Sequence, residues 1–298
     1  MSLDATVLSS NQLVSVKCIN SFFHQDEVSV VEYLNSSDLK NDDRNHCVPL
    51  VLDTLHPAKD KSFMVTPLLR SFDDPQFDTI GELVDFLRQA FEGLDFMHDH
   101  NVAYRCSTME MMLDPVSLYP EMYHPIAPGR SRDLSSQAHH TTRTVQPSKY
   151  YFTDFGNAKK YKPDDDRLAG PVSMGLQQQP PEFRHSSQAQ DPFPTDVYYL
   201  GDMIRRELIQ KYRGLEFLSD LVKQMTAENP AQRPTIKDAA NTFSDAWGAL
   251  TVAELRARLV PVSEAERGWL VRAARIVRHT FRTMSYRLQG LPPVPARK

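Results

Sequence analysis

The fold is decided by residues 98–114, His-Asp-His-Asn-Val-Ala-Tyr-Arg-Cys-Ser-Thr-Met-Glu-Met-Met-Leu-Asp, read together with residues 151–156, Tyr-Phe-Thr-Asp-Phe-Gly. An apolar pattern with helical spacing ends at Met97 and runs into a tight polar loop. Residues 111–113, Met-Met-Leu, then predict a short strand, and residues 154–156, Asp-Phe-Gly, close a second strand. The expected order of elements is therefore helix, polar loop, strand and strand.

This order resembles the catalytic centre of a protein kinase. In that family the loop reads His-Arg-Asp, four further residues and then Asn, and a later Asp-Phe-Gly follows. The loop Asp accepts the proton of the substrate hydroxyl, and the Asn and the second Asp hold magnesium. The corresponding positions here are Tyr104, Arg105, Cys106 and Met111, followed by Asp154. The resemblance implies a kinase scaffold in which the catalytic base and the second metal ligand are replaced.

Three side chains of the loop are poor substitutes for those of a kinase. Cys106 is shorter than aspartate by one heavy atom, and its thiol, with a pKa near 8.5, is mostly neutral at about pH 7. Met111 offers only a thioether, a poor ligand for an oxygen-seeking cation. Thr108 replaces the loop lysine that usually touches the transferring phosphate. Because a positioned base is typically worth roughly 10² to 10⁴ in rate, weak phosphotransfer or none is expected.

The N-terminal residues resemble the part of a kinase that holds the nucleotide. Residues 13–19, Leu-Val-Ser-Val-Lys-Cys-Ile, alternate as a half-buried strand does, and Lys17 matches the lysine that holds the phosphates. Read alone, Lys17 is more simply a solvent-facing lysine on an ordinary strand. Glu27, however, begins a helical stripe with apolar residues at i+3, i+4 and i+7. It resembles the regulatory-helix glutamate that pairs with that lysine.

Two more strands are expected before the helical part. Residues 46–53, His-Cys-Val-Pro-Leu-Val-Leu-Asp, are interpreted as a buried strand, and residues 63–69, Phe-Met-Val-Thr-Pro-Leu-Leu, as the strand that leads into the hinge. The resemblance makes Thr66 the gatekeeper that faces the adenine pocket. It also makes Pro67 to Leu69 the hinge.

The Gly-rich loop of a kinase has no counterpart in this sequence. That loop normally joins two strands ahead of the lysine strand and folds its N–H groups over the phosphates. Only sixteen residues precede Lys17, and none of them is glycine. Residues 1–12 are expected to supply at most one strand, so the roof of the nucleotide site is expected to be absent. Either the natural protein lacks it or the sequence begins inside a longer one.

The middle of the chain predicts helices and one long insert. Residues 80–100 carry apolar side chains at three- and four-residue spacing, which predicts an amphipathic helix that delivers the loop. Residues 115–149 are rich in Pro, Ser, His and Thr, lack periodicity and predict a surface insert. His139 and His140 are interpreted as solvated rather than metal-binding, because no Cys or carboxylate lies nearby at ligand spacing.

Later motifs follow in the order of the kinase family. Residues 157–179 form an irregular polar segment that corresponds to the activation segment, and the Pro-Pro-Glu that ends at Glu182 resembles its Ala-Pro-Glu terminator. Asp196 begins the sequence Asp-Val-Tyr-Tyr-Leu-Gly, which resembles the start of the central helix, whose Asp braces the catalytic loop. Arg233 lies in Asn-Pro-Ala-Gln-Arg-Pro-Thr, and the resemblance implies that it pairs with Glu182.

Length and composition limit the class of protein. The 298 residues, 41% of them hydrophobic, suffice for one kinase-sized unit of two lobes. A net charge of −4 gives no global attraction to nucleic acid, so none is expected as a partner. Cys18, Cys47 and Cys106 lack ligand spacing and no signal peptide opens the chain, which favours an intracellular setting, cytoplasmic or nuclear.

The tail, residues 254–298, is basic and amphipathic. It holds ten Arg and Lys against three Glu, a net charge of +7. Six apolar side chains share one helical face: Trp269, Ala273, Ile276, Val277, Phe281 and Met284. One interpretation is a helix docked on the large lobe through Trp269, Ile276 and Phe281. The other, less favoured, is a basic amphipathic surface for a membrane or a partner.

We therefore expect an α+β fold with the two lobes of a protein kinase, a truncated N-lobe and a mainly α-helical C-lobe. The expected parts are residues 1–69 with the N-lobe and hinge, 70–248 with the C-lobe and its insert, and 249–298 with the extension. The resemblance runs from about Leu13 to Phe243. It is closest to the kinase-domain proteins found in large numbers in mushroom-forming fungi.

Three functions remain open at this point. The first is a pseudokinase, a scaffold or switch for a protein partner that binds ATP and Mg²⁺ weakly through Lys17, Glu27 and Asp154. The second is a weakly active Ser/Thr-type kinase that transfers the γ-phosphate of ATP to a protein hydroxyl with a substitute base. The third is an interaction module that binds no nucleotide.

Overall fold

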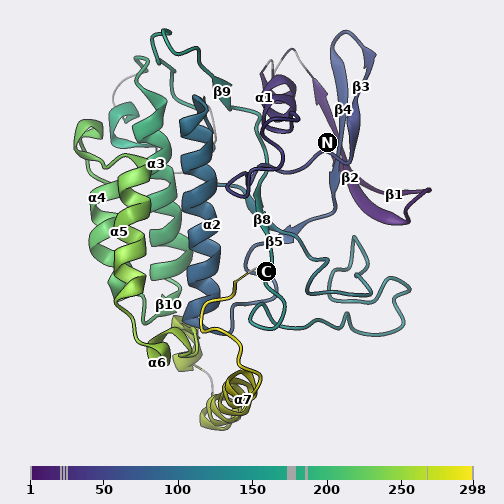
Figure 1. The fold of residues 1–298 in the computed structure, drawn as a ribbon, viewed down its shortest axis with the longest axis vertical. Coiled ribbons are helices and arrows are strands. Elements are labelled where there is room, and N and C mark those ends of the chain that lie inside the picture. Colours follow the sequence, from purple (N-terminus) through teal and green to yellow (C-terminus); the bar gives the residue numbers. More distant parts are fainter. Residues whose placement is uncertain are drawn as a thin grey trace.

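The computed structural model of the chain describes residues 2–20, 22, 24, 26–172, 179–184, 187–266 and 268–296. These residues form an α+β fold, with a four-stranded sheet on one side and a group of long helices on the other (Figure 1). The predicted fold class is confirmed at this level. Among the described residues, no helix combines the length and the apolar character that crossing a membrane requires.

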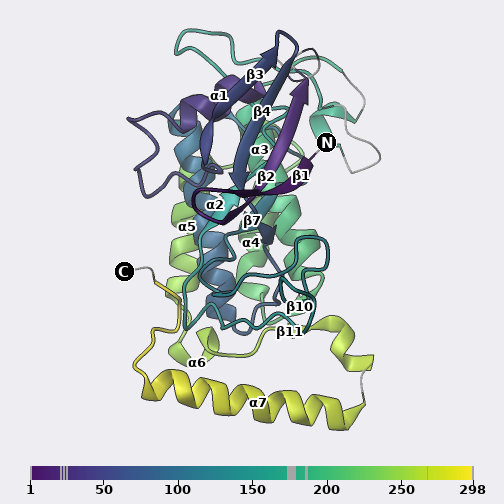
Figure 2. The same ribbon diagram turned by 90° about the vertical axis from the view of Figure 1, so that its right-hand side faces the viewer.

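An antiparallel sheet of order β1-β2-β4-β3 forms the N-terminal part (Figure 2). Its strands are β1 (Ser2–Val7), β2 (Gln12–Asn20), β3 (Leu52–Ala58) and β4 (Lys61–Pro67). The strands predicted over residues 13–19 and 63–69 are confirmed as β2 and β4. Residues 1–12 supply one strand, as expected, although Met1 lies outside the described residues.

The strand predicted over residues 46–53 is confirmed only at its end, because β3 begins at Leu52. Residues 46–48 are buried, but residues 46–51 form no strand and have only a single bridge, between Cys47 and Phe152. Pro49 has no N–H to contribute to a ladder. The Asn35 side chain satisfies the backbone on both sides of Pro49, since it donates to the Val48 carbonyl at 3.2 Å and accepts the Leu50 N–H at 3.0 Å. The apolar residues around Pro49 therefore form a loop that the hydrogen bonds of Asn35 hold in place.

Helix α1 (Glu27–Leu34) lies beside the sheet (Figure 1). It buries Glu27 together with the apolar stripe predicted from the sequence: Val30, Val31 and Leu34. The stripe belongs to the same hydrophobic core as Ile19 of β2 and Met64 of β4. This packing holds the Glu27 carboxylate against the sheet.

The helix predicted over residues 80–100 is confirmed as α2 (Ile80–Asp99), which lies on the side of the helical part nearest the strands (Figure 1). Its N-terminus is capped by the Thr79 hydroxyl, which accepts the Glu82 N–H at 3.1 Å. The other helices of this part are α3 (Pro192–Met203), α4 (Ser219–Met225), α5 (Ile236–Gly248) and α6 (Val252–Leu255), with a π-helical segment at Ile204–Ile209. Short 3-10 turns occur at Pro181–Phe183, Glu216–Leu218, Pro230–Gln232 and Val262–Glu266. The strands β10 (Tyr212–Arg213) and β11 (Val260–Pro261) form a separate pair.

Helix α3 does not begin at the predicted residue. Its cap is Asp191, which accepts the Phe193 N–H at 3.0 Å, and Pro192 takes the first helical position. Asp196 was expected at the helix start but lies more than a turn inside. The acidic residue that caps the helix is therefore Asp191, and Asp196 does not act as a cap.

Short strands connect the sheet to the helices. A three-stranded sheet contains β5 (Arg70–Ser71), β7 (Met111–Leu113) and β8 (Tyr150–Phe152), and β6 (Val102–Ala103) pairs with β9 (Lys159–Lys160). The strand predicted over residues 111–113 is confirmed. The second strand ends before Asp154, whose left-handed φ of 52° turns the chain out of the extended conformation.

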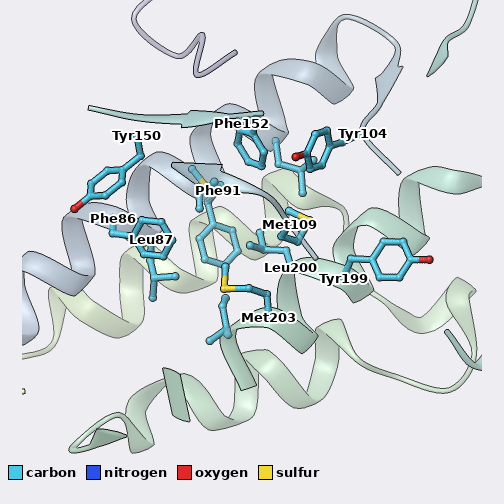
Figure 3. Close-up of a cluster of buried hydrophobic side chains, with 14 of the residues drawn as sticks. Phe86, Leu87, Phe91, Tyr104, Met109, Tyr150, Phe152, Tyr199, Leu200 and Met203 are labelled. Atoms are coloured by element: carbon cyan, nitrogen blue, oxygen red, sulfur yellow. The ribbon is translucent and has the colours of Figure 1, made fainter. Parts of the chain in front are cut away.

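A hydrophobic core lies between these strands and the helices (Figure 3). Phe86 and Phe91 of α2 and Phe152 of β8 point into it, as does Tyr104 of the loop before β7 (Figure 3). The Tyr104 ring packs edge-on against Phe152 and Phe155, at centroid distances of 5.0 and 5.4 Å. The core therefore fixes the loop relative to the residues that follow β8.

The insert, residues 115–149, contains no helix or strand, as predicted. It is nevertheless not confined to the surface. Tyr119 is buried beneath Arg70, whose guanidinium lies 4.7 Å from the ring centroid, and Thr144 donates its N–H and hydroxyl to the buried Glu82 carboxylate. The predicted surface position is wrong for Tyr119 and Thr144. Buried residues that lie far apart in an irregular segment leave no periodic pattern in the sequence.

Helix α7 (Trp269–Leu288) lies across one end of the molecule (Figure 2). The predicted docking face is wrong, since its three side chains are exposed: Trp269 by 69%, Ile276 by 56% and Phe281 by 70%. The helix docks through its polar side instead, where Arg282 pairs with Asp78 and Tyr286 is buried. The neighbouring surface offers carboxylates at Asp78 and Glu264, which attract arginines rather than apolar side chains. Residues 267, 297 and 298 of the tail lie outside the described residues.

Candidate functional site

Lys17 lies between two carboxylates from distant parts of the sequence. Its Nζ is 2.5 Å from Glu27 Oε1 on α1 and 2.9 Å from Asp154 Oδ1 after β8. The Glu27 side chain is 1% exposed, whereas that of Asp154 is 44% exposed. The structure thus brings together these three predicted site residues, in a cluster that is closed at Glu27 and open at Asp154.

The two carboxylates of this cluster favour the protonated form of Lys17, and together they carry more negative charge than Lys17 balances. Burial lowers the pKa of Lys17, but the Glu27 carboxylate and then that of Asp154 outweigh it, so the pKa is raised on balance. Two carboxylates face one ammonium, which leaves an excess of negative charge. Oε2 of Glu27 is also buried without a hydrogen bond in the described part of the chain. A cation at the open side, beside Asp154, would balance this excess.

A cavity of about 310 Å³ opens beside Lys17. Thr66, Pro67 and Leu69 line it, and so do Glu27 and Asp154. The predicted gatekeeper and hinge positions therefore surround the same cavity as the charged cluster. Met112 of β7 also lines it, whereas the sequence pointed to its neighbour Met111.

The backbone beside the cavity leaves one donor unused. The Leu68 N–H donates to the Leu13 carbonyl at 3.2 Å, and the Leu69 carbonyl accepts the Tyr123 hydroxyl at 3.4 Å. The Leu69 N–H forms no hydrogen bond with any described residue. Because Leu69 lines the cavity, this N–H is available to a ligand acceptor.

The loop before β7 is held by Asp196, whose side chain is fully buried. Its two oxygens accept the N–H groups of Tyr104 at 2.8 Å and Arg105 at 2.7 Å, and His98 Nε2 lies 3.1 Å away. Arg105 has a left-handed φ of 56°, a region that residues other than glycine seldom adopt. The predicted brace of the loop by Asp196 is confirmed. It holds a backbone conformation that the loop would not keep by itself.

The predicted catalytic-base position is occupied by a buried thiol with two polar neighbours. Cys106 Sγ lies 3.3 Å from Thr108 Oγ1, which donates in turn to Glu110 Oε1 at 3.0 Å. Glu110 is exposed. Sequence reasoning missed this carboxylate, although an acidic residue inside the loop was a visible signal. It is the acidic side chain that the structure links to the base position.

Two predicted site residues point elsewhere. The Met111 side chain is 4% exposed and belongs to the hydrophobic core, so it does not line the cavity. Arg105 donates to the carbonyls of Asn157 at 3.1 Å and Gly170 at 3.0 Å. Arg105 therefore holds the segment after β8 in place. Residues 173–178 of the predicted activation segment lie outside the described residues.

The donor set fits a metal ion that arrives with a phosphate. Magnesium is usually bound by one or two carboxylates, substrate phosphates and water, and Asp154 offers one exposed carboxylate. Among the described residues there is no group of three or more His, Cys, Asp or Glu side chains able to hold a metal by themselves. His139 and His140 are exposed, as predicted.

A buried ion pair fixes the segment that ends at residue 182. Arg233 donates to both oxygens of Glu182, at 2.9 and 2.7 Å, and the side chains are 0% and 5% exposed. The bridge predicted between them is confirmed. Two parallel bonds of this kind give both strength and a defined geometry.

Replacing Glu182 by glutamine is expected to lower the free energy of unfolding by about 2 to 4 kcal/mol, because the buried Arg233 loses its counter-charge. Urea denaturation followed by circular dichroism measures the loss. The matched control is Glu228→Gln, since Glu228 is 79% exposed and pairs with Arg184 at the surface. That variant is expected to lose less than about 1 kcal/mol. Equal losses in the two variants would contradict the structural role of the buried pair.

No model of a known protein family matches the sequence, and no curated protein is found to be similar to it. Function is therefore inferred from the geometry of the site.

Proposed function

We propose that this chain is a protein-kinase-like pseudokinase of two lobes, which binds ATP with magnesium and transfers little or no phosphate. The observation that carries the proposal is the position of Lys17, which bonds to both Glu27 and Asp154 at the edge of one cavity. A lysine, a buried carboxylate that orients it and an exposed carboxylate beside it are the groups with which a kinase holds phosphate and metal.

The adenine and the phosphates of a nucleotide each have a matching group at this site. The Leu69 N–H suits a ring nitrogen of adenine, in a cavity that Met112 and Thr66 line. The Lys17 ammonium suits the phosphates, and Asp154 suits a magnesium ion that the phosphates also bind. Magnesium would supply charge neutralisation of the phosphates. In the protein without nucleotide, Asp154 takes the place of the phosphates as the partner of Lys17.

The same loop lacks the groups that transfer requires. The Cys106 thiol is buried and its hydrogen-bond neighbour is Thr108, so no carboxylate occupies the base position. Met111 is in the core and offers no oxygen to a second metal ion. These features favour binding without turnover, and hence a switch or scaffold whose partner reads the nucleotide-bound state.

A second candidate is a weak kinase that uses Glu110 as its base. Glu110 is exposed and hydrogen-bonds to Thr108, which in turn contacts Cys106. A carboxylate in this position has the chemistry needed to accept a proton from a substrate hydroxyl. This candidate requires the acceptor hydroxyl to approach from the side of Glu110.

The test incubates the protein with magnesium and ATP labelled at the γ-phosphate. It measures the melting temperature and the label transferred to the protein or to peptides. We expect the melting temperature to rise, because a ligand at 100 times its Kd adds about 2.7 kcal/mol of apparent stability. We expect no label in the protein or in Ser/Thr peptides above background. Lys17→Ala should remove the thermal shift, while Lys61→Ala, an exposed lysine of the same sheet, should retain it.

Two outcomes would contradict the proposal in different ways. Magnesium-dependent labelling that Asp154→Ala abolishes would establish an active kinase, and its loss in Glu110→Gln would identify Glu110 as the base. A melting temperature that millimolar ATP leaves unchanged would leave only an interaction module without nucleotide.

A further inference from the structure

Helix α7 turns its apolar side away from the protein. Eight large apolar side chains are exposed along it, and six of them lie on neighbouring positions around the helix: Trp269 by 69%, Leu270 by 64%, Val277 by 53%, Phe281 by 70%, Met284 by 56% and Leu288 by 84%. With a repeat of about 3.6 residues per turn, these positions fall on one broad face of the helix. We call these six side chains the outer face. Tyr286 alone among the residues of α7 is fully buried against the protein.

The inward side of α7 is polar and specifically bound. Arg275 pairs with Glu264 at 3.0 Å, Arg282 pairs with Asp78, and the His279 ring bonds to the Arg256 carbonyl at 3.0 Å. A helix that packs for burial alone turns its apolar side inward. Here the ion pairs hold the helix in the opposite orientation, so the outer face is left to an external partner.

The charged side chains that α7 itself carries are all positive. Residues 268–298 contain no Asp or Glu. Arg272, Arg278 and Arg287 of α7 are exposed and form no ion pair with any described residue. A second copy of the chain would bring these arginines against their own equivalents, which is unfavourable. An anionic lipid surface supplies both the negative charge and the apolar layer.

The position of α7 suits a flat partner. The helix forms one extreme end of the molecule, and its axis runs across that end (Figure 2). Its 20 residues give a length of about 30 Å. Nothing in the view extends beyond the helix on that side, so a plane can touch it along its whole length. Trp269 stands at its first turn, and tryptophan is enriched at the boundary between headgroups and acyl chains.

We propose that α7 is a membrane-surface helix that lies in the interface of a bilayer containing anionic lipids. The outer face enters the boundary between headgroups and acyl chains, and Arg272, Arg278 and Arg287 contact the lipid phosphates or carboxylates. The ion pairs of Arg275 and Arg282 hold the rest of the protein above the bilayer. This function is separate from nucleotide binding, and neither depends on the other.

The test measures binding of the full chain to sucrose-loaded vesicles by sedimentation, with phosphatidylcholine alone or with about 30% phosphatidylserine. We expect binding to the anionic vesicles, a weaker association with the neutral ones, and a further loss at high salt. The double variant Val277→Glu with Phe281→Glu should bind at least about tenfold more weakly, because it places charge in the apolar face. The matched control is Ile126→Glu, at a side chain that is 82% exposed but distant from α7 in sequence.

Three results would overturn this proposal. One is a wild-type protein that stays in the supernatant at millimolar anionic lipid. The next is a double variant that melts at the wild-type temperature and sediments with vesicles as well as the wild type does. The last is a wild-type protein that dimerises without lipid, while the double variant is monomeric, because a second copy would then be the occupant of the outer face.

Discussion

Replacing Asp196 by alanine is expected to lower the free energy of unfolding by about 3 to 5 kcal/mol. The Asp196 carboxylate is fully buried and accepts the N–H groups of Tyr104 and Arg105. Alanine leaves both donors without an acceptor, at a cost of about 1 to 3 kcal/mol each when they stay buried. His98 also loses its partner. The loop that carries Cys106 is then free to relax from the left-handed conformation at Arg105.

Urea denaturation measures this loss, and Asp191→Ala is its matched control. Asp191 is an exposed carboxylate on the same helix and accepts one N–H as the cap of α3. Its removal is expected to cost about 1 kcal/mol. An Asp196→Ala protein as stable as Asp191→Ala would show that the loop does not depend on this brace.

Restoring an aspartate at position 106 and an asparagine at position 111 is expected to raise phosphotransfer by roughly 10² to 10⁴ over the wild type. Cys106→Asp returns a carboxylate to a loop that Asp196 already holds in place. Met111→Asn adds the amide that a kinase has at this position, but the wild-type side chain faces the core and not the cavity, so the gain is expected mainly from position 106. The wild-type Met111 is 4% exposed, so the amide costs stability unless it is paired, and the melting temperature must be measured alongside the rate.

The matched control carries Cys106→Asn with Met111→Asn, because an asparagine at position 106 is nearly the size of aspartate but is uncharged and cannot act as a base. Label transfer from γ-labelled ATP to Ser/Thr peptides compares the two proteins, and Asp154→Ala in the restored protein should abolish it. A restored protein that folds, binds ATP and labels no more than the control would contradict the assignment of position 106.

Local patterns predicted the elements that depend on neighbouring residues. The strand around Lys17, the helix that begins at Glu27 and helix α2 were all visible as periodic patterns, because burial imposes a repeat on each of them. The pairs Lys17–Glu27 and Glu182–Arg233 were implied by the resemblance to a kinase. The structure places both pairs in contact.

The errors lie where distant residues decide the outcome. Residues 46–53 look like one strand, but Pro49 and the side chain of Asn35 make residues 46–51 a loop, and the strand begins only at Leu52. The amphipathic pattern of α7 identified an apolar face correctly. It did not indicate which side meets the protein, because that depends on Asp78, about 200 residues earlier in the chain.

In the candidate site, too, some features could be predicted from the sequence and others depend on distant residues. The sequence located Lys17, Glu27 and Asp154, but it gave no sign that Met111 turns into the core. Whether a short strand presents its first or second methionine to the cavity depends on register, which only the pairing of β7 with its neighbours determines. The link from Cys106 through Thr108 to Glu110 likewise depends on how the loop folds.

The most direct test is a calorimetric titration of the wild-type protein with ATP in the presence of magnesium. Binding through Lys17 and Asp154 predicts one saturable site. Lys17→Ala should weaken it at least about tenfold, since hydrogen bonds to charged groups are worth about 1.5 to 3 kcal/mol, and Lys61→Ala should leave it unchanged. A wild-type protein without saturable heat at millimolar ATP, or a Lys17→Ala variant that binds as tightly as the wild type, would contradict the proposed nucleotide site.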